Sequence, residues 1–219
     1  MQLSCMYLSI FSQSKKIDYN MFWDLVSNYY SVFENLFNGK VNSEMCKHVA
    51  EKIDSNDDVL ECACGTGMIS ACIAPVCNSL VATDYSDGML RNAKENCKAF
   101  GNVRIEKGDI MHLPYADGSF DKVVAANVIH LLDKPELALA ELMRVCHKGG
   151  MVIIPTYIFS KRSWFARSFM KIVNCFTKTF VNQFSEESYK EFFKRLGYSN
   201  ASFDIVEGRM ACAIAFLPS

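Results

Sequence analysis

The chain has 219 residues, half of them apolar, 21% charged and 12% aromatic, with a formal net charge of −1. This length suits one domain that can bury a core, and 11 glycines and 5 prolines are too few for a disordered low-complexity chain. The near-neutral charge argues against a nucleic-acid binder driven by overall charge, and no apolar run approaches the roughly 20 residues that a bilayer span needs.

The first segment of the chain, residues 1–20, lacks the basic start that is typical of a signal peptide. We expect either a disordered leader or a misassigned start codon here, because the first convincing helical pattern begins at Met21. Residues 21–54 are then predicted to form N-terminal helices that cap the core.

Short β-rich runs alternate with helical patterns over residues 55–156, which we take as the core. The predicted strands are 59–62, 79–83, 102–106, 121–126 and 151–155. The predicted helices run from the end of Gly-Thr-Gly at 65–67 to about 74, over 87–100, and from 135 to the glycine pair at 149–150. Pro135 suits the first turn of a helix, where its missing N–H costs nothing. Gly101 marks the end of the second helix.

Residues 185–219 are predicted to add one helix and a β-hairpin. The helix covers 186–196, and the two strands cover 201–206 and 210–216. The three-residue join between those strands implies an antiparallel pair. Together these elements predict an α/β fold with a doubly wound, Rossmann-like sheet of seven strands, mostly parallel, whose last hairpin is antiparallel. Ligands bind such sheets at the carboxyl ends of the strands, near the point where strand order reverses.

A glycine-rich loop follows the first predicted strand. Gly65 and Gly67 allow a tight turn and a close approach of backbone to a ligand, and a helix that begins there points free N–H groups at the turn. A nicotinamide-binding Rossmann protein uses a similar loop, but Ser70 takes the place of its third glycine. Glu61 at the start of the loop would repel a pyrophosphate and attract a cationic ligand.

Acidic residues follow the next two predicted strands. Asp84 ends the second strand, where a carboxylate can accept both hydroxyls of a ribose. The alternative is that Asp84 only caps the following helix. Asp109 follows the third strand, and its alternative is an ordinary turn residue.

Five motifs in fixed order resemble those of the class I S-adenosylmethionine-dependent methyltransferases, in particular the branch of small-molecule and ubiquinone/menaquinone-biosynthesis methyltransferases. They are Glu-Cys-Ala-Cys-Gly-Thr-Gly at 61–67, Asp84, Gly-Asp at 108–109, Leu-Pro-Tyr-Ala-Asp-Gly-Ser-Phe-Asp at 113–121, and Arg-Val followed by Gly-Gly over 144–150. The resemblance covers roughly residues 19–216. It departs from the family at Ala63, where glycine is usual, and we expect the extra methyl to restrict the loop slightly.

The resemblance implies S-adenosylmethionine as cofactor, S-adenosylhomocysteine as product, and a cofactor-binding role for a set of residues. The loop should line the methionine part, with Glu61 near the ammonium; Asp84 should hold the ribose, Tyr85 the adenine, and Asp109 the adenine amino group. The full set is Tyr30, Glu61, Ala63, Cys64, Gly65, Thr66, Gly67, Asp84, Tyr85, Met89, Asp109, Ile110 and Asn127.

His130 follows the fourth predicted strand and is the candidate catalytic residue. A histidine with an ordinary pKa near 6.5 could take a proton from an acceptor. The alternative is a polar residue beside the cofactor, because alignment of the acceptor with the transferred methyl supplies much of the rate.

Residues 157–184 depart from the alternating pattern and are aromatic and basic. The plainest interpretation is a helix that packs one apolar face on the core. The alternatives are a lid over an apolar acceptor or a surface that contacts an anionic membrane. With the N-terminal helices this inserted cap is predicted to form the acceptor pocket, from Trp23, Tyr157, Trp164 and Phe165.

The sequence therefore predicts direct in-line transfer of a methyl group to a small, hydrophobic or aromatic acceptor. The rival hypotheses are a nicotinamide-dependent oxidoreductase and a non-catalytic protein that binds S-adenosylmethionine. We expect no nucleic-acid partner, a monomer or homodimer, and no metal, since the four histidines are scattered. The ten cysteines form no Cys-x-x-Cys pair, which favours reduced thiols in a cytoplasmic protein.

Overall fold

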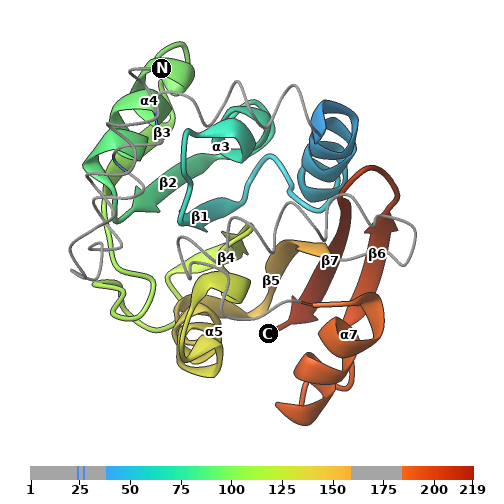
Figure 1. The fold of residues 1–219 in the computed structure, drawn as a ribbon. Coiled ribbons are helices and arrows are strands. Elements are labelled where there is room, and N and C mark those ends of the chain that lie inside the picture. Colours follow the sequence, from blue (N-terminus) through green and yellow to red (C-terminus); the bar gives the residue numbers. More distant parts are fainter. Residues whose placement is uncertain (1–23, 25–26, 28–37, 159–183) are drawn as a thin grey trace, which may run out of the picture.

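The computed structural model describes residues 24, 27, 38–158 and 184–219, and they form a sheet with helices on both faces (Figure 1). The strands are β1 Asp58–Cys62, β2 Ser79–Asp84, β3 Val103–Lys107, β4 Phe120–Ala125, β5 Cys146–Ile158, β6 Ser202–Val206 and β7 Ala211–Pro218. The helices are one over 38–50, α3 Met68–Ile73, α4 Asp87–Cys97, the short 3₁₀ helix η1 Ile129–Leu131, α5 Pro135–Val145 and α7 Glu186–Arg195.

The seven strands lie in the order β3-β2-β1-β4-β5-β7-β6. The first five strands pair in parallel, and β7 is antiparallel to both of its neighbours. The predicted seven-stranded, mostly parallel sheet with an antiparallel last hairpin is confirmed. The order reverses at β1, because β2 lies on one side of it and β4, which comes later in the chain, lies on the other.

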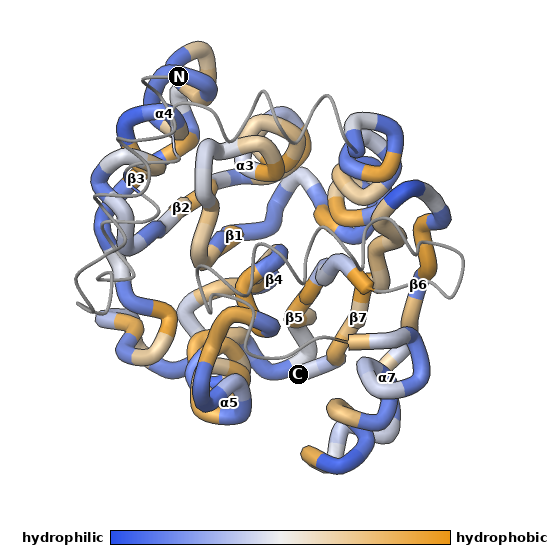
Figure 2. Tube along the Cα trace, viewed as in Figure 1, coloured by the Kyte–Doolittle hydropathy of each residue, from blue (hydrophilic) through white to orange (hydrophobic). Residues whose placement is uncertain are grey.

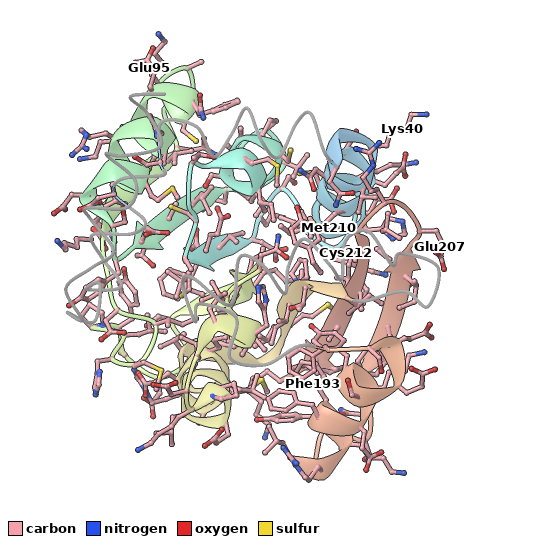
Figure 3. The ribbon with its side chains drawn as sticks, in the orientation of Figure 1. Lys40, Glu95, Phe193, Glu207, Met210 and Cys212 are labelled. Carbon is pink, nitrogen blue, oxygen red and sulfur yellow. The ribbon has the colours of Figure 1, made fainter. Side chains whose placement is uncertain are left out.

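Successive side chains of a strand point to opposite faces of the sheet, so the core has two parts, one on each face. Leu60 of β1 packs on one face with α5 and α7, whereas Val59 packs on the other with the helix over 38–50, α3 and α4. Phe193 of α7, labelled in Figure 3, is buried. Its ring meets that of Tyr189 edge to face at 5.0 Å. The hydrophobic colour in Figure 2 follows this pattern, concentrated in the central strands and on one side of each helix.

The helix over 38–50 holds the turn between β6 and β7. The side-chain oxygen of Asn38 accepts a hydrogen bond from the backbone N–H of Met210 at 3.2 Å, and its nitrogen donates to the carbonyl of the same residue at 2.9 Å. Figure 3 labels Met210 beside this helix. The helix therefore closes the carboxyl edge of the sheet on the side of β7.

Two expectations about local structure are corrected. The helix predicted to end at Gly149 and Gly150 already ends at Val145, and β5 begins at Cys146, which pairs with Phe120 of β4. A Cβ on Gly150 would lie 2.3 Å from the carbonyl oxygen of Asp121, so that glycine serves close strand pairing. Helix α4 ends at Cys97 instead of residue 100.

The described residues include eight cysteines, and none of these eight forms a disulfide. In the same part of the chain no helix combines the length and apolar character that a membrane span requires. The predicted leader, Trp23, Tyr30 and nearly all of the inserted cap, including Trp164 and Phe165, lie outside the described residues.

Candidate active site

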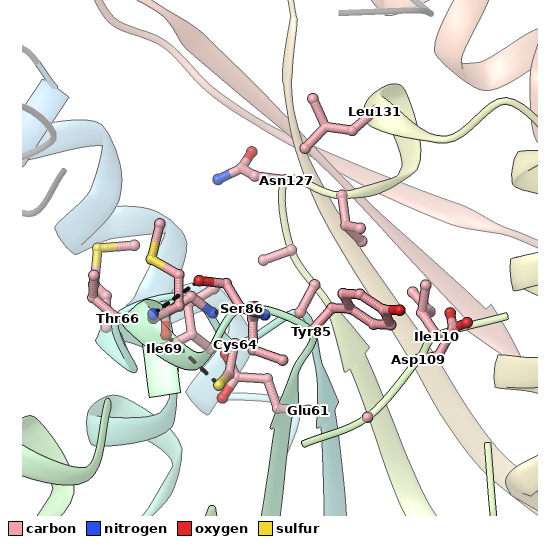
Figure 4. A pocket seen from close by; sticks show the side chains of 18 of the residues that line it. Glu61, Cys64, Thr66, Ile69, Tyr85, Ser86, Asp109, Ile110, Asn127 and Leu131 are labelled. Carbon is pink, nitrogen blue, oxygen red and sulfur yellow. Dashed lines mark hydrogen bonds between the residues drawn. The ribbon is translucent and has the colours of Figure 1, made fainter. Parts of the chain in front are cut away.

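A cavity of about 330 Å³ lies at the carboxyl edge of the sheet, where strand order reverses. The residues that line it lie at or after the ends of the four strands β1 to β4. Ligands bind open α/β sheets at this place, beside the reversal of strand order. Figure 4 shows their side chains converging from these strand ends. The lining residues are Glu61, Ala63, Cys64, Gly65, Thr66, Met68, Ile69, Asp84, Tyr85, Ser86, Met89, Gly108, Asp109, Ile110, Ala126, Asn127, Val128, Leu131 and Leu132.

The loop after β1 turns sharply beneath the cavity. Gly67, with φ at 80°, is the N-cap of α3, and a Cβ there would lie 3.0 Å from the Cα of Ala93 in α4. Glycine at this position therefore permits both the left-handed turn and the contact between α3 and α4. The loop places backbone, with little side-chain bulk, at the cavity wall.

Ala63 in the same loop has a φ of 55°, in the left-handed region. That conformation costs an L-residue roughly 1–2 kcal/mol, because Cβ approaches the carbonyl oxygen. The methyl group of Ala63 is expected to restrict the loop, and its effect is strain in the backbone of Ala63. That residue lines the cavity.

Glu61 is buried, with 2% of its surface exposed, and its carboxylate accepts a hydrogen bond from the hydroxyl of Ser70. Burial raises the pKa of Glu61 to about 8, since a charged carboxylate loses its hydration there. Burial therefore favours the uncharged form of Glu61. A cation bound beside it would favour the charged form.

Asp84 connects the loop after β1 to the start of α4. One of its oxygens accepts from the N–H of Gly65 at 2.8 Å, and the other accepts from the N–H of Ser86 at 2.9 Å. Burial raises the pKa of Asp84, and the two N–H donors oppose that rise. The interpretation of Asp84 as the helix cap is wrong, because Ser86 is the N-cap of α4 and accepts from the N–H of Met89.

Tyr85, Asp109 and Ile110 form the wall nearest β3 (Figure 4). Tyr85 is half exposed although its ring is large and apolar, and the ammonium of Lys107 lies 5.7 Å from the ring centre. The carboxylate of Asp109 accepts from the N–H of Met111 at 2.9 Å. The turn hypothesis for Asp109 therefore describes its local role, and the same side chain also lines the cavity.

Asn127 follows β4 with a φ of 52°, a conformation that asparagine tolerates better than most residues. Its N–H donates to the carbonyl of Pro155 at 2.8 Å, and its side-chain oxygen accepts from the N–H of Tyr157 at 3.1 Å. The hydroxyl of Tyr157 bonds the side-chain oxygen of Asn42 at 2.5 Å. Asn127 lines the cavity and Tyr157 does not, so the acceptor role of Tyr157 stays a prediction.

His130 belongs to η1 and is buried, with 7% of its surface exposed. Its neighbours Leu131 and Leu132 line the cavity, whereas His130 is not among the lining residues. Burial lowers the pKa of His130 to about 4, so the imidazole is neutral at pH 7. Its role as a base stays a prediction.

Residues 60–154 match the family described as a methyltransferase domain. This part of the chain is similar to that family of methyltransferase domains. The matched region runs from within β1 to within β5 and includes every residue that lines the cavity.

Two curated relatives, both named methyltransferases, are similar to part of this chain. An uncharacterised chloroplastic methyltransferase of Arabidopsis thaliana is 32% identical over 110 residues, which cover 47% of this chain and 31% of the relative. Demethylmenaquinone methyltransferase of Staphylococcus aureus is 32% identical over 140 residues, which cover 60% of this chain and 56% of the relative. The match spans only about a third to about half the length of these relatives.

A solved structure from Thermotoga maritima has the same fold. It is described as a SAM-dependent methyltransferase, possible histamine N-methyltransferase, and superposes with a TM-score of 0.69 at 20% identity, covering 90% of this chain and 98% of that chain. The Rossmann-like arrangement of the sheet and helices is thus shared with that structure.

The structure brings most of the predicted cofactor residues to one cavity. Of that set only Gly67, at the end of the loop after β1, and Tyr30, outside the described residues, are not among the lining residues. Sequence reasoning missed Met68, Ile69, Ser86, Gly108, Ala126, Val128, Leu131 and Leu132. Each lies within a few residues of a predicted strand end, so extending those ends would have found them.

Within the described residues, no three His, Cys, Asp or Glu side chains converge as a metal site requires. The expectation that no metal is needed stays a prediction.

Proposed function

We propose that this protein is an S-adenosylmethionine-dependent methyltransferase that acts on a small, hydrophobic or aromatic acceptor. The observation that carries the proposal is an apolar cavity at the reversal of strand order, with the carboxylate of Asp84 at the end of β2. The methyltransferase domain match over residues 60–154 supports the reaction class.

The residues present fit S-adenosylmethionine. Asp84 offers carboxylate oxygens to a ribose diol at the position where acidic residues serve nucleotides in related folds. The half-exposed ring of Tyr85 offers a flat surface to an adenine. Glu61 offers a carboxylate that a bound ammonium would ionise.

When bound, the cofactor would supply an electrophilic methyl group on a sulfonium for direct transfer to the acceptor, with S-adenosylhomocysteine as the leaving group. The contribution of this chain is to bind, align and desolvate the reactants. Met68, Val128, Leu131 and Leu132 give the cavity an apolar lining that excludes water. Asn127, fixed by its hydrogen bond to the N–H of Tyr157, is a polar group held rigidly at the end of β4.

Calorimetry with S-adenosylhomocysteine and, separately, with NADH tests the proposal against the oxidoreductase hypothesis. The wild type should bind S-adenosylhomocysteine and not NADH. Asp84→Ala should weaken that binding at least about a hundredfold, because two charge-assisted hydrogen bonds of roughly 1.5–3 kcal/mol each are lost. Asp117→Ala is the control, since Asp117 pairs with Arg144 and does not line the cavity. Binding of NADH alone would overturn the proposal.

The acceptor is proposed from the apolar lining and from a relative whose name specifies demethylmenaquinone. Labelled S-adenosylmethionine with a panel of quinols, phenols and aliphatic amines would identify the acceptor class. Transfer to none of these, in a protein that binds the cofactor, would favour the non-catalytic hypothesis.

We propose further that the protein is a cytoplasmic monomer or homodimer that contacts a membrane through residues 157–184. Gel filtration tests the oligomeric state, and vesicle flotation tests the membrane contact.

A further inference from the structure

The N-terminal part of the chain contacts the start of α4 through Asp24 and Ser27. Ser27 is buried, and its backbone carbonyl accepts from the side-chain amide of Asn92 at 3.0 Å. A Cβ on Gly88 would lie 2.7 Å from the hydroxyl oxygen of Ser27 and 3.0 Å from a carboxylate oxygen of Asp24. Glycine at position 88 therefore allows these two residues to sit directly on the first turn of α4.

A single oxygen of Asp24 accepts two hydrogen bonds at that turn. The hydroxyl of Ser86 donates to it at 2.5 Å, and the N–H of Gly88 donates at 2.8 Å. These donors hold the pKa of Asp24 below its usual range, so the carboxylate is charged at neutral pH. A negative charge here also suits the positive end of the helix dipole.

Asp24 is not the cap of α4, because Ser86 already has that role. The hydroxyl oxygen of Ser86 accepts from the N–H of Met89 while its hydrogen points to Asp24. Asp24 therefore fixes the orientation of the Ser86 side chain. It lies outside the cavity and outside the methyltransferase domain match.

Continuous hydrogen bonds lead from Asp24 to the cavity. Asp24 holds Ser86, whose N–H donates to Asp84, and the other oxygen of Asp84 accepts from the N–H of Gly65. Ser86, Asp84 and Gly65 all line the cavity. A displacement of Asp24 should therefore shift the carboxylate that is proposed to hold the ribose.

We propose that Asp24 is a positioning residue that couples its own contact with the first turn of α4 to the binding of a nucleoside cofactor at Asp84. The inference rests on the proposed function, because the ligand is the one proposed there. Coupling of this kind is reciprocal, so the cofactor should strengthen the contact between Asp24 and α4 by the same factor by which that contact strengthens cofactor binding.

Two variants break the contact from opposite sides. Asp24→Ala removes the acceptor, and Gly88→Ala places a methyl group against Asp24 and Ser27 while leaving α4 a better helix former. Both should weaken S-adenosylhomocysteine binding in calorimetry at least about fivefold, the lower end of typical coupling between linked sites. If Asp24→Ala does not fold, Gly88→Ala alone decides the outcome.

Asp24→Asn keeps an oxygen acceptor for both donors and should retain affinity within about twofold of the wild type. Asp87→Ala is the matched control, since Asp87 is a carboxylate of the same helical turn that pairs instead with Lys107. Its affinity should also stay within about twofold. Hydrogen exchange at the Gly88 amide should slow when S-adenosylhomocysteine binds the wild type and should not slow in Asp24→Ala.

Wild-type affinity in both disrupting variants, or affinity lost equally in Asp87→Ala, would overturn the inference. A lower melting temperature in the disrupting variants with unchanged affinity would also overturn it, because Asp24 would then be purely structural. A wild type that fails to bind S-adenosylhomocysteine would instead refute the proposed function.

Discussion

Ala63 has the left-handed backbone conformation that glycine adopts without strain, so Ala63→Gly should stabilise the protein. The relief of strain is roughly 1–2 kcal/mol. The greater conformational entropy of glycine in the unfolded chain opposes this gain in stability by roughly 0.4–1 kcal/mol. At the midpoints of these two ranges the net gain is about 0.8 kcal/mol, which in a chain of this size raises the melting temperature by roughly 2–3 °C.

The assay is calorimetric melting of the wild type, Ala63→Gly and a matched control, Ala126→Gly. Ala126 lines the same cavity, next to Asn127, but does not have a positive φ. The identical substitution there should lower the melting temperature, because only the entropic cost and the lost methyl remain. A decrease in Ala63→Gly similar to that in Ala126→Gly would refute the argument from strain.

Four further predictions address charge, proton transfer, metal and the inserted cap. Burial raises the pKa of Glu61 to about 8. Between about pH 4.5 and 8 the folded state therefore keeps a proton on Glu61 that the unfolded state has already released. Stability is therefore lost over that interval, and Glu61→Gln should raise the melting temperature at pH 8 but hardly at pH 5. His130→Gln should lower kcat less than about threefold; a loss of a hundredfold or more would mark His130 as a general base. Chelator treatment should leave methyl transfer unchanged, and activity restored only by added zinc or magnesium would contradict this. Trp164→Ala or Phe165→Ala should weaken acceptor turnover and spare cofactor affinity, and parallel loss of both would indicate core packing.

The residues that line the cavity could be predicted largely because sheet topology brings strand ends together. Asp84, Asp109 and Asn127 each follow a β-rich run, and parallel pairing carries them to one edge. The sequence pattern did not predict the ends of elements that are set by pairing with a strand far along the chain. Cys146 leaves the helical pattern because it pairs with Phe120, a partner that no local signal specifies.

The contact at Asp24 was also beyond sequence reasoning. An aspartate within a helical pattern gives no sign that Gly88, far along the chain, will present an N–H to it. Likewise the φ of Ala63 follows from the closure of the loop onto Asp84, and alanine itself has no preference for that region. Both features depend on contacts that only the assembled fold supplies.

The position of β7 between β5 and β6 has a consequence for how the chain folds. Strand β6 is synthesised before β7 but, among the strands that the structure describes, pairs only with β7, so it has no place in the sheet until β7 has formed. The two strands are close in sequence and should associate first with each other, then dock as a unit on β5. Seven consecutive residues of β7 are buried in the finished sheet. Until β7 pairs with β5, it is an apolar strand edge that other chains can contact. The nascent protein should therefore be most prone to aggregate before the β6–β7 pair docks on β5.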